Sequence, residues 1–390
     1  MKDFFPLPGG RNAAGSLEEN FKDYLGLDYA HVTYSGTAAL YFILEALKEA
    51  SSKKTVIIPS FICPLVPLAI TRAGLRVEVC DINKNDFNFN AEELARLCRQ
   101  NNDILAVIAA HLAGIPLDFD PIRNICVGKE IFIIEDCAQS LGATYAGKKV
   151  GALGDVSFFS LCRGKGLTIY EGGVVVTGRK DLSGLLDDKI RSLSKRDLFS
   201  ESMKIFELFG YWFFYRPQLF WFVFRLPQIF WNSLGNKTRA DLEYGGKDFP
   251  THRVSSIRKS IGSRVFARLD SEIGSQREKA RYYISCLSGE TGIKPVAAPA
   301  GSDAAYPFLT LLFEDQKKKE RVLRELTKSG LGASYIYGRP VTDYDYLKGV
   351  VPDKKYPAAD FFSRHHLTLS TSAFMKKKDM DSVIDKIKTS

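Results

Sequence analysis

One lysine, Lys165, is placed in this 390-residue chain where it could do covalent chemistry. It lies between Gly164 and Gly166, after the apolar stretch VSFFSL (156–161) and before VVVT (174–177), and both stretches are typical of strands. A lysine on such a turn suits a Schiff base, because partial burial and nearby charge make its amine nucleophilic. On this segment alone, a surface lysine in a turn is the more common alternative.

Two other positions carry residue types that bind ligands. Ser35-Gly36-Thr37 separates a short strand from a long amphipathic helix, whose first N–H groups and the Thr37 hydroxyl suit a phosphate. The alternative is a simple helix cap on a core helix. Asp136 follows the apolar run IFII and precedes Gln139. Its carboxylate either caps the next helix or faces a ligand nitrogen.

The elements that must position these residues alternate along the chain. Apolar runs at 55–60, 75–82, 104–111, 131–139 and 156–161 are separated by mostly helical stretches, which predicts a parallel α/β sheet with crossover helices. Functional groups in such sheets lie just past the C-terminal ends of the strands. Asp81, His111 and Asp136 occupy such ends.

Composition indicates a globular intracellular protein. Hydrophobic residues make up 45% and charged residues 25%, and the length suggests two domains at roughly 150 residues each. The seven cysteines show no CxxC spacing, so we expect neither a disulfide framework nor a metal site. The N-terminus lacks a signal-peptide pattern, which favours the cytoplasm. The net charge of +9 favours anionic partners such as phosphorylated substrates or an acidic membrane surface, and we expect no nucleic-acid partner.

Six motifs in a fixed order give the chain a family resemblance. They are SGTAAL, PSFICP, AHLAGIPLD, IIEDCAQSLGA, VGALGDVSFFS and GKGLTIYEGG, and together they resemble DegT-type sugar aminotransferases. The similarity runs from about Gly15 through residues 252–274, and more weakly to the end. It implies an α/β fold of the fold-type-I transferases that use pyridoxal 5'-phosphate (PLP), with a mostly parallel central sheet and a smaller C-terminal α+β domain. It also implies glutamate as amino donor and a homodimer with shared active sites.

The resemblance assigns roles to the residues singled out above. Lys165 matches the Schiff-base lysine, which also shuttles a proton, and Asp136 matches the carboxylate under the pyridine nitrogen. Gln139 matches the residue that bonds the phenolic oxygen of the cofactor. The phosphate contacts correspond to Gly36, Thr37 and Ser160. His111 either lines the pocket or is a satisfied structural hydrogen-bonding residue.

The chain departs from the family pattern at two places. The family has an aromatic residue that stacks on the cofactor where PSFICP has Cys63, and Phe61 is a candidate replacement. The family motif asparagine-x-arginine, which reaches the phosphate of the neighbouring subunit, is matched here by residues 251–253. Arg253 fits this motif, but the asparagine is missing.

We expect a large PLP-binding domain over 1–250, with an aromatic insert at about 200–245, and a small α+β domain over 251–390. Residues 205–231 hold all three tryptophans, and prolines and arginines interrupt them, which argues against a membrane-spanning helix. The segment is either buried in the core or the dimer interface, or it contacts a membrane surface, since cations flank it. Membrane contact would suit a lipid-linked substrate, whereas burial would suit a soluble nucleotide-linked sugar.

The predicted function is transfer of an amino group, from glutamate, onto a keto-sugar. One alternative is a PLP-dependent sugar dehydratase, a branch in which histidine replaces the lysine, and Lys165 argues against it. A second alternative is a non-catalytic membrane-associated protein on the same fold. The presence of Lys165, Asp136 and Gln139 argues against that alternative. Residues 330–340, GLGASYIYGRP, are expected to face the substrate, whose identity the sequence does not reveal.

Overall fold

The computed structural model describes residues 15–214 and 249–390. Within these ranges the largest sheet has seven strands in the order β1-β9-β8-β5-β4-β2-β3. Neighbouring strands from β8 to β3 run parallel, and β9 is antiparallel to both β8 and β1. The predicted mostly parallel sheet is therefore confirmed. The strands are β1 (Tyr29–Thr33), β2 (Thr55–Pro59), β3 (Arg76–Cys80), β4 (Ile104–Ala110), β5 (Phe132–Asp136), β8 (Val156–Ser160) and β9 (Gly173–Thr177).

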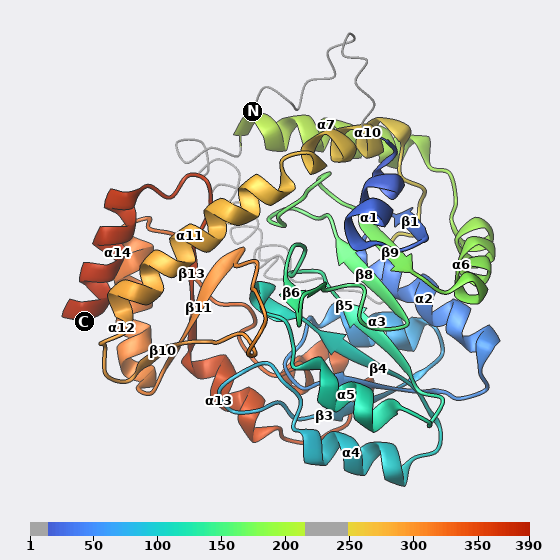
Figure 1. Cartoon of the computed structure of the whole chain (residues 1–390), viewed down its shortest axis with the longest axis horizontal. Coiled ribbons are helices and arrows are strands. Elements are labelled where there is room, and N and C mark those ends of the chain that lie inside the picture. The colour runs from blue at the N-terminus through green and yellow to red at the C-terminus, as the bar shows by residue number, and fades with distance from the viewer. Residues whose placement is uncertain (1–14, 215–248) are drawn as a thin grey trace.

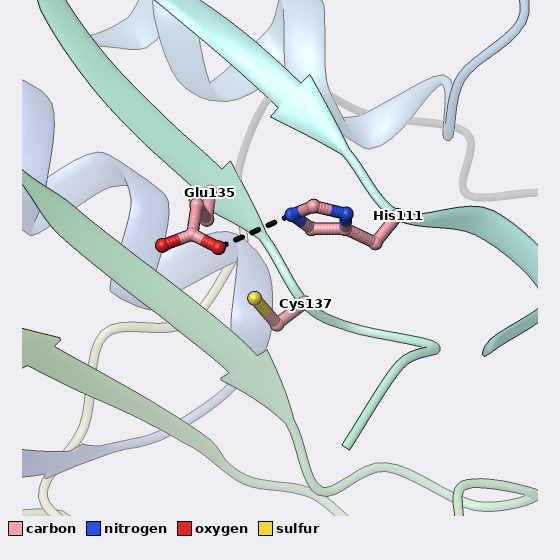
Figure 2. Close-up of side chains that lie close together, drawn as sticks. All are labelled: His111, Glu135 and Cys137. Atoms are coloured by element: carbon pink, nitrogen blue, oxygen red, sulfur yellow. Dashed lines mark hydrogen bonds and ion pairs between the residues drawn. The ribbon is translucent and has the colours of Figure 1, made fainter. Parts of the chain in front are cut away.

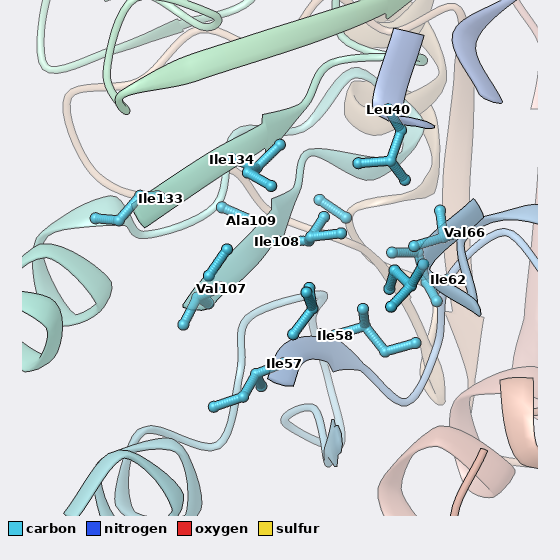
Figure 3. Close-up of a cluster of buried hydrophobic side chains, with 14 of the residues drawn as sticks. Leu40, Ile57, Ile58, Ile62, Val66, Val107, Ile108, Ala109, Ile133 and Ile134 are labelled. Carbon is cyan, nitrogen blue, oxygen red and sulfur yellow. The ribbon is translucent and has the colours of Figure 1, made fainter. Parts of the chain in front are cut away.

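The central strands are apolar because helices cover both faces of the sheet. Every residue of β4 is buried, and its side chains pack with those of β2 and β5 in the core shown in Figure 3. Leu40 reaches the same core from a helix. The helices connecting the strands are α2 (Gly36–Ala50), α3 (Leu65–Arg72), α4 (Ala91–Gln100) and α5 (Phe119–Cys126), and α6 (Lys180–Leu193) follows β9, the last strand of this sheet along the chain.

The first helix, α1 (Leu17–Leu25), begins after a serine and ends before a glycine. The Ser16 hydroxyl accepts the Glu19 N–H at 3.1 Å, which satisfies one free donor of the first turn. Gly26 ends the helix at φ 66°, a left-handed conformation that glycine adopts without steric cost. The helix packs against α10 (Ser256–Phe266), with the Phe21 and Phe266 rings 5.1 Å apart.

The C-terminal part carries a second sheet, with four antiparallel strands in the order β10-β11-β13-β12 among the described residues. Figure 1 shows this sheet beside α11, α12 and α14, at one side of the large sheet. The domain boundary at residue 250 stays a prediction. The remaining elements are β6 (Thr144–Tyr145), β7 (Lys148–Lys149), α11 (Leu269–Leu287), β10 (Ile293–Pro295), β11 (Phe308–Phe313), α12 (Gln316–Lys328), β12 (Ala333–Ser334), α13 (Pro357–His365), β13 (His366–Ser370) and α14 (Lys377–Thr389), with short 3₁₀ turns at Leu112–Gly114, Val341–Asp343 and Asp345–Leu347.

Helix α7 (Leu198–Phe214) contains the beginning of the aromatic segment. Residues 205–214 form its C-terminal part, whereas 215–231, with the PQLFW and PQIFW repeat, lie outside the described residues. In the part of the chain that the structure describes, the helices are too short or too polar to cross a bilayer.

Candidate active site

A cavity of about 250 Å³ lies at the C-terminal edge of the large sheet. All six residues predicted to bind a cofactor line it, although they come from segments that are far apart in the chain. Residues from the C-terminal part and from the segment before α10 complete its wall. The lining residues include Gly36, Thr37, Cys63, Leu112, Asp136, Gln139, Ser160, Lys165, Glu171, Phe249 and Tyr337.

One end of the cavity is the N-terminus of α2. The Ser35 hydroxyl caps this helix by accepting the Ala38 N–H at 3.1 Å. The N–H groups of Gly36 and Thr37 are in the first turn and have no carbonyl partner within the helix. A Cβ at Gly36 would lie 3.1 Å from the Cβ of Ser160, so glycine allows the helix start to approach that residue closely. The two interpretations of Ser35-Gly36-Thr37 are thus compatible, since one residue caps the helix and the other two face the cavity.

Asp136 ends strand β5, with β4 and β8 on either side. Its side chain is 5% exposed, and one carboxylate oxygen accepts the Ala138 N–H at 3.0 Å. Burial raises the pKa of Asp136, and the hydrogen bond from Ala138 and the charge of Lys165 oppose this rise only in part. A buried carboxylate of this kind is stabilised by a protonated ring nitrogen.

Gln139 is held between two partners at the cavity wall. Its side-chain oxygen accepts the Ala113 N–H at 2.9 Å, and its amide nitrogen donates to the Tyr337 hydroxyl at 3.2 Å. Burial raises the pKa of Tyr337 well above its ordinary value, and it also raises the pKa of the nearby Cys63 thiol. Both groups are therefore neutral near pH 7, and this side of the cavity carries no negative charge from them.

Lys165 is half-buried on a loop that folds back on itself. Backbone hydrogen bonds join Leu161 to Gly172 at 2.8 Å and Arg163 to Tyr170 at 3.0 Å, and these close the loop. Tyr170 adopts φ 74°, an uncommon conformation for a residue with a side chain. Next to it, Glu171 lines the cavity and pairs with Lys204 of α7 at 2.9 Å. The lysine is therefore presented by a closed loop that α7 braces.

Comparison with known proteins identifies the family. The profile of the DegT/DnrJ/EryC1/StrS aminotransferase family matches residues 9–210 and 233–388. The chain belongs to this family. It is 27% identical over 383 residues to the UDP-4-amino-4,6-dideoxy-N-acetyl-beta-L-altrosamine transaminase of Campylobacter jejuni, a match that covers 97% of this chain and 89% of the relative.

Solved structures show the same fold. A sugar aminotransferase from Micromonospora echinospora superposes with a TM-score of 0.74 at 20% identity, covering 96% of this chain and 90% of that one. A GDP-4-keto-6-deoxy-D-mannose-3-dehydratase from E. coli, solved with bound hydrated PLP, gives a TM-score of 0.73 at 19% identity, covering 95% and 90%. Since an aminotransferase and a dehydratase share the architecture, the fold does not by itself select the reaction.

His111, for which the sequence left a pocket-lining and a structural role open, is fully buried and is not among the residues that line the cavity. Its Nδ1 accepts the Leu117 N–H at 2.9 Å, which leaves the proton on Nε2, 3.2 Å from a Glu135 oxygen. Both ring nitrogens are occupied by protein groups. The geometry therefore favours the structural alternative for this histidine.

The same histidine belongs to a group of metal-ligand types. Among the described residues, His111, Glu135 and Cys137 have potential ligand atoms within 4.8 Å of one another (Figure 2). The Glu135 carboxylate, however, also accepts backbone N–H groups from Gly151, Leu153 and Gly154 at 2.7–2.8 Å. These donors satisfy its oxygens, so the cluster acts as a clamp that fixes the turn entering strand β8, upstream of Lys165.

Phe61 and Arg253 lie outside the cavity wall formed by the described residues. Phe61 is 1% exposed and packs behind Tyr337, with the two ring centroids 5.3 Å apart. Arg253 is exposed, and its guanidinium donates to the Arg191 carbonyl at 3.3 Å. In this chain neither side chain contacts the cavity that Lys165 lines.

Two of the lining residues named above lie outside the family motifs. Tyr337 falls within the range expected to face the substrate, but nothing in its sequence context marks it above its neighbours. Phe249 also lines the cavity, as does Glu171, which the motif GKGLTIYEGG contains but to which no role was assigned. A second cavity of about 40 Å³ contacts Lys165 as well, and α11 contributes Glu272 and Gln276 to it. Their helix has no motif that would have pointed to this place.

Proposed function

We propose that this protein is a PLP-dependent aminotransferase that moves an amino group from glutamate onto a keto-sugar. The observation that carries the proposal is the cavity itself. Its wall brings together a half-buried lysine on a loop, a buried carboxylate, a glutamine and a helix N-terminus. Each of these groups matches a different part of the same cofactor.

The residues present fit PLP in three ways. The N–H groups of Gly36 and Thr37, with the Ser160 hydroxyl, would hold the phosphate at the positive end of α2. The buried Asp136 carboxylate, whose pKa burial raises, gains an ionic partner from a protonated pyridine nitrogen. Gln139 offers an amide N–H to the phenolic oxygen. When bound, PLP supplies an electron sink for negative charge at the substrate carbon.

The remaining work is done by protein groups. Lys165 is the base that removes the proton from the amino-bearing carbon of the donor. In the second half of the reaction, it delivers a proton to the carbon of the keto-sugar that receives the amino group. Asp136 keeps the pyridine nitrogen protonated. The neutral Cys63 and Tyr337 side chains bound the cavity without adding charge, and Leu112 and Phe249 exclude water from the same wall.

The acceptor that best fits the comparisons is a nucleotide-linked keto-sugar. The Campylobacter relative is named for a UDP-linked amino sugar and covers nearly all of this chain. The dehydratase alternative is less favoured, because Lys165 stands where that branch has histidine. The net charge of +9 also suits a substrate that carries a diphosphate.

We also propose a cytoplasmic homodimer with shared active sites, divided into domains near residue 250. The exposed position of Arg253, away from the cavity of its own chain, supports a role in the site of a second subunit. Peripheral association with a membrane surface belongs to the same proposal. It is supported by the cationic residues before α7 and by the aromatic composition of 205–231.

The test begins with the purified protein. Its visible absorbance should show a bound pyridoxal chromophore that changes on addition of glutamate, with release of 2-oxoglutarate. Borohydride reduction followed by peptide mapping should place a pyridoxyl group on Lys165, and a panel of UDP- and GDP-linked keto-sugars should identify the acceptor. A protein that binds no PLP, or whose spectrum ignores glutamate and other amino donors, would refute the proposal.

A further inference from the structure

Tyr337 differs in origin from the other residues of the cavity wall. Among the described residues that line the cavity, it is the one that follows residue 250 in the chain. Its side chain is partly buried, as is that of Cys63 in the same wall. A ring from the C-terminal part of the chain therefore completes a wall that is otherwise formed, within the described ranges, by residues up to 250.

The Tyr337 hydroxyl lies where two other lining side chains meet. It accepts an N–H of the Gln139 amide at 3.2 Å. Burial raises the pKa of the Cys63 thiol, and the Tyr337 hydroxyl opposes that rise, an effect that requires the hydroxyl to lie beside the thiol. Burial also raises the pKa of Tyr337 itself, and the nearby Cys63 and Asp136 add to the rise. The hydroxyl therefore keeps its proton near pH 7, close to the groups assigned to the cofactor ring.

A backbone hydrogen bond joins the two segments that carry Tyr337 and Cys63. The Val341 N–H donates to the Ser60 carbonyl at 2.8 Å. Val341 follows Tyr337 by one short turn of chain, and Ser60 lies just before Cys63. The position of Tyr337 opposite the thiol is therefore set by the pairing of these two segments.

His366 fixes the backbone next to Tyr337. Its Nε2 accepts the Ile336 N–H at 2.9 Å, while its Nδ1 donates to the Phe362 carbonyl at 2.8 Å. Burial lowers the pKa of His366 to about 4, so the imidazole is neutral near pH 7 and can accept that bond. The Phe61 ring packs against both residues, 5.3 Å from the Tyr337 ring and 5.4 Å from the imidazole. Tyr337 is thus supported from behind the wall, since neither Phe61 nor His366 lines the cavity.

The other aromatic rings of the described wall have different surroundings. Phe158 belongs to strand β8 and is 3% exposed. The Arg72 guanidinium lies 4.3 Å from the centroid of the Phe249 ring and donates to the Phe249 carbonyl. A flat cofactor ring packs favourably against an aromatic side chain. Among the described lining residues, Tyr337 is the one that combines such a ring with a hydrogen bond to Gln139.

We propose that Tyr337 is a cofactor-positioning residue, whose ring covers the pyridine ring of PLP at the wall shared with Cys63 and whose hydroxyl orients the Gln139 amide. That amide has two N–H groups, so one can bond to Tyr337 while the other remains for the phenolic oxygen of the cofactor. The inference rests on the proposed function, because it needs bound PLP. It gives Tyr337 the place for which the sequence suggested Phe61.

The first test measures the affinity of the cofactor-free, full-length protein for PLP by absorbance titration. Tyr337→Ala should weaken binding by roughly 5- to 150-fold, the combined effect of losing one aromatic contact and one neutral hydrogen bond. Tyr337→Phe keeps the ring and should weaken binding less. Equal affinities of the parent and Tyr337→Ala would overturn the inference.

The second test moves the ring from one position to the other. In the parent, Cys63→Phe should weaken PLP binding, because two rings and the cofactor then compete for the same space. In the Tyr337→Ala background the same change should strengthen binding, since the new ring fills the space that the tyrosine left. The affinity should rise toward that of Tyr337→Phe. Weaker binding in both backgrounds would show that Tyr337 does not share this wall with Cys63.

The hydroxyl has its own readout, the pH at which the visible absorbance of bound PLP changes. An amide N–H held toward the phenolic oxygen stabilises its ionised form, so Tyr337→Phe, which releases the Gln139 amide, should raise this pH. The variant with both Cys63→Phe and Tyr337→Ala should keep the raised value, because phenylalanine has no hydroxyl. An unchanged pH in Tyr337→Phe would contradict the role of the hydroxyl.

The matched control makes the same two changes away from the cavity. Tyr335 is 53% exposed, and Cys286 lies on α11 and does not line the cavity. Tyr335→Ala with Cys286→Phe should leave the affinity for PLP unchanged.

Failure of this inference can be distinguished from failure of the proposed function. A parent protein that binds PLP and turns over glutamate, with an affinity for PLP that does not depend on Tyr337, refutes the inference alone. A protein that needs Tyr337 to bind PLP but reacts with no amino donor refutes the aminotransferase and leaves the inference standing. A parent that binds no PLP refutes both.

Discussion

The ion pair between Arg258 and Glu201 joins α10 to α7 and offers a quantitative test of the structure. Arg258 is fully buried, and its guanidinium donates to both Glu201 oxygens and to the Glu171 carbonyl. We consider Arg258→Met, which keeps the length of the side chain but removes its charge and donors. The variant leaves the Glu201 carboxylate buried, with the Ser255 N–H as its remaining partner among the hydrogen bonds described above.

The expected cost follows from the uncompensated charge. Removing one member of a buried ion pair destabilises a protein by about 3–5 kcal/mol. Adding Glu201→Gln removes the buried charge while keeping an acceptor for Ser255. The double variant should therefore recover about 2 kcal/mol of that loss, and the rest reflects lost hydrogen bonds at about 1 kcal/mol each.

The cost should also depend on pH. Burial favours a raised pKa for Glu201, but the hydrogen bonds from Arg258 outweigh it and hold that pKa below its ordinary value of 4.5. In the parent, the stabilisation is complete above pH 4.5 and is lost as pH falls through the lowered pKa. In Arg258→Met only Ser255 still opposes the effect of burial, so the pKa of Glu201 rises and protonation relieves the cost of the buried charge. The difference between parent and variant should be largest at pH 7 and shrink toward pH 4.5.

The assay is urea unfolding of the cofactor-free parent, both single variants and the double variant at several pH values. A loss below about 1 kcal/mol for Arg258→Met would show that the pair is solvated and not buried. Strict additivity of the two changes would show that the residues do not interact. Either result would refute the account of how α7 is held in place.

Three further predictions concern the cavity. Lys165→Ala should abolish turnover and borohydride-trapped PLP. The thermal unfolding midpoint of the cofactor-free protein should stay unchanged, since the lysine is half-buried on a loop and outside the core. Retained turnover would show that Lys165 is not a catalytic residue. Asp136→Asn should lower the rate by about 10²-fold or more, and a near-parental rate would mean that another group protonates the ring. Because burial raises the pKa of Asp136, the same change should stabilise the cofactor-free protein toward urea at high pH, with an advantage that fades as pH falls. Tyr337→Phe removes the acceptor of the Gln139 amide and should weaken PLP retention by roughly 2- to 13-fold, the equivalent of one neutral hydrogen bond. As a control, Tyr335→Phe at an exposed position should leave PLP retention unchanged. Equal retention in both variants would show that the Tyr337 hydroxyl is not part of the site.

The sequence by itself determined the residues of the site that lie at strand ends and helix starts. Lys165, Asp136 and the Gly36-Thr37 pair are each placed by local patterns, an apolar strand followed by a turn or a helix. In a parallel sheet such ends meet at one edge, so strand order along the chain was sufficient to bring these residues together. The family motifs then favoured a cofactor role for Lys165 over a surface role, and this assignment stays a prediction.

Only the tertiary structure determined the roles of residues that depend on contacts with distant parts of the chain. Tyr337 meets Gln139 across 198 positions of sequence, and no local pattern encodes that contact. His111 is structural because Leu117 and Glu135 occupy its two nitrogens, a choice made by neighbours and not by its position at a strand end.

The orientation of α7 also depends on long-range contacts that no local sequence pattern specifies. Its periodicity predicts an apolar stripe, and by the usual rule that stripe would face the core. The fold leaves Phe199 and Phe206 exposed and buries Leu208 on the inner side, where Glu201 pairs with Arg258 and Lys204 pairs with Glu171. Periodicity specifies which residues share a face of a helix, whereas the partners that long-range folding supplies determine which face meets the protein.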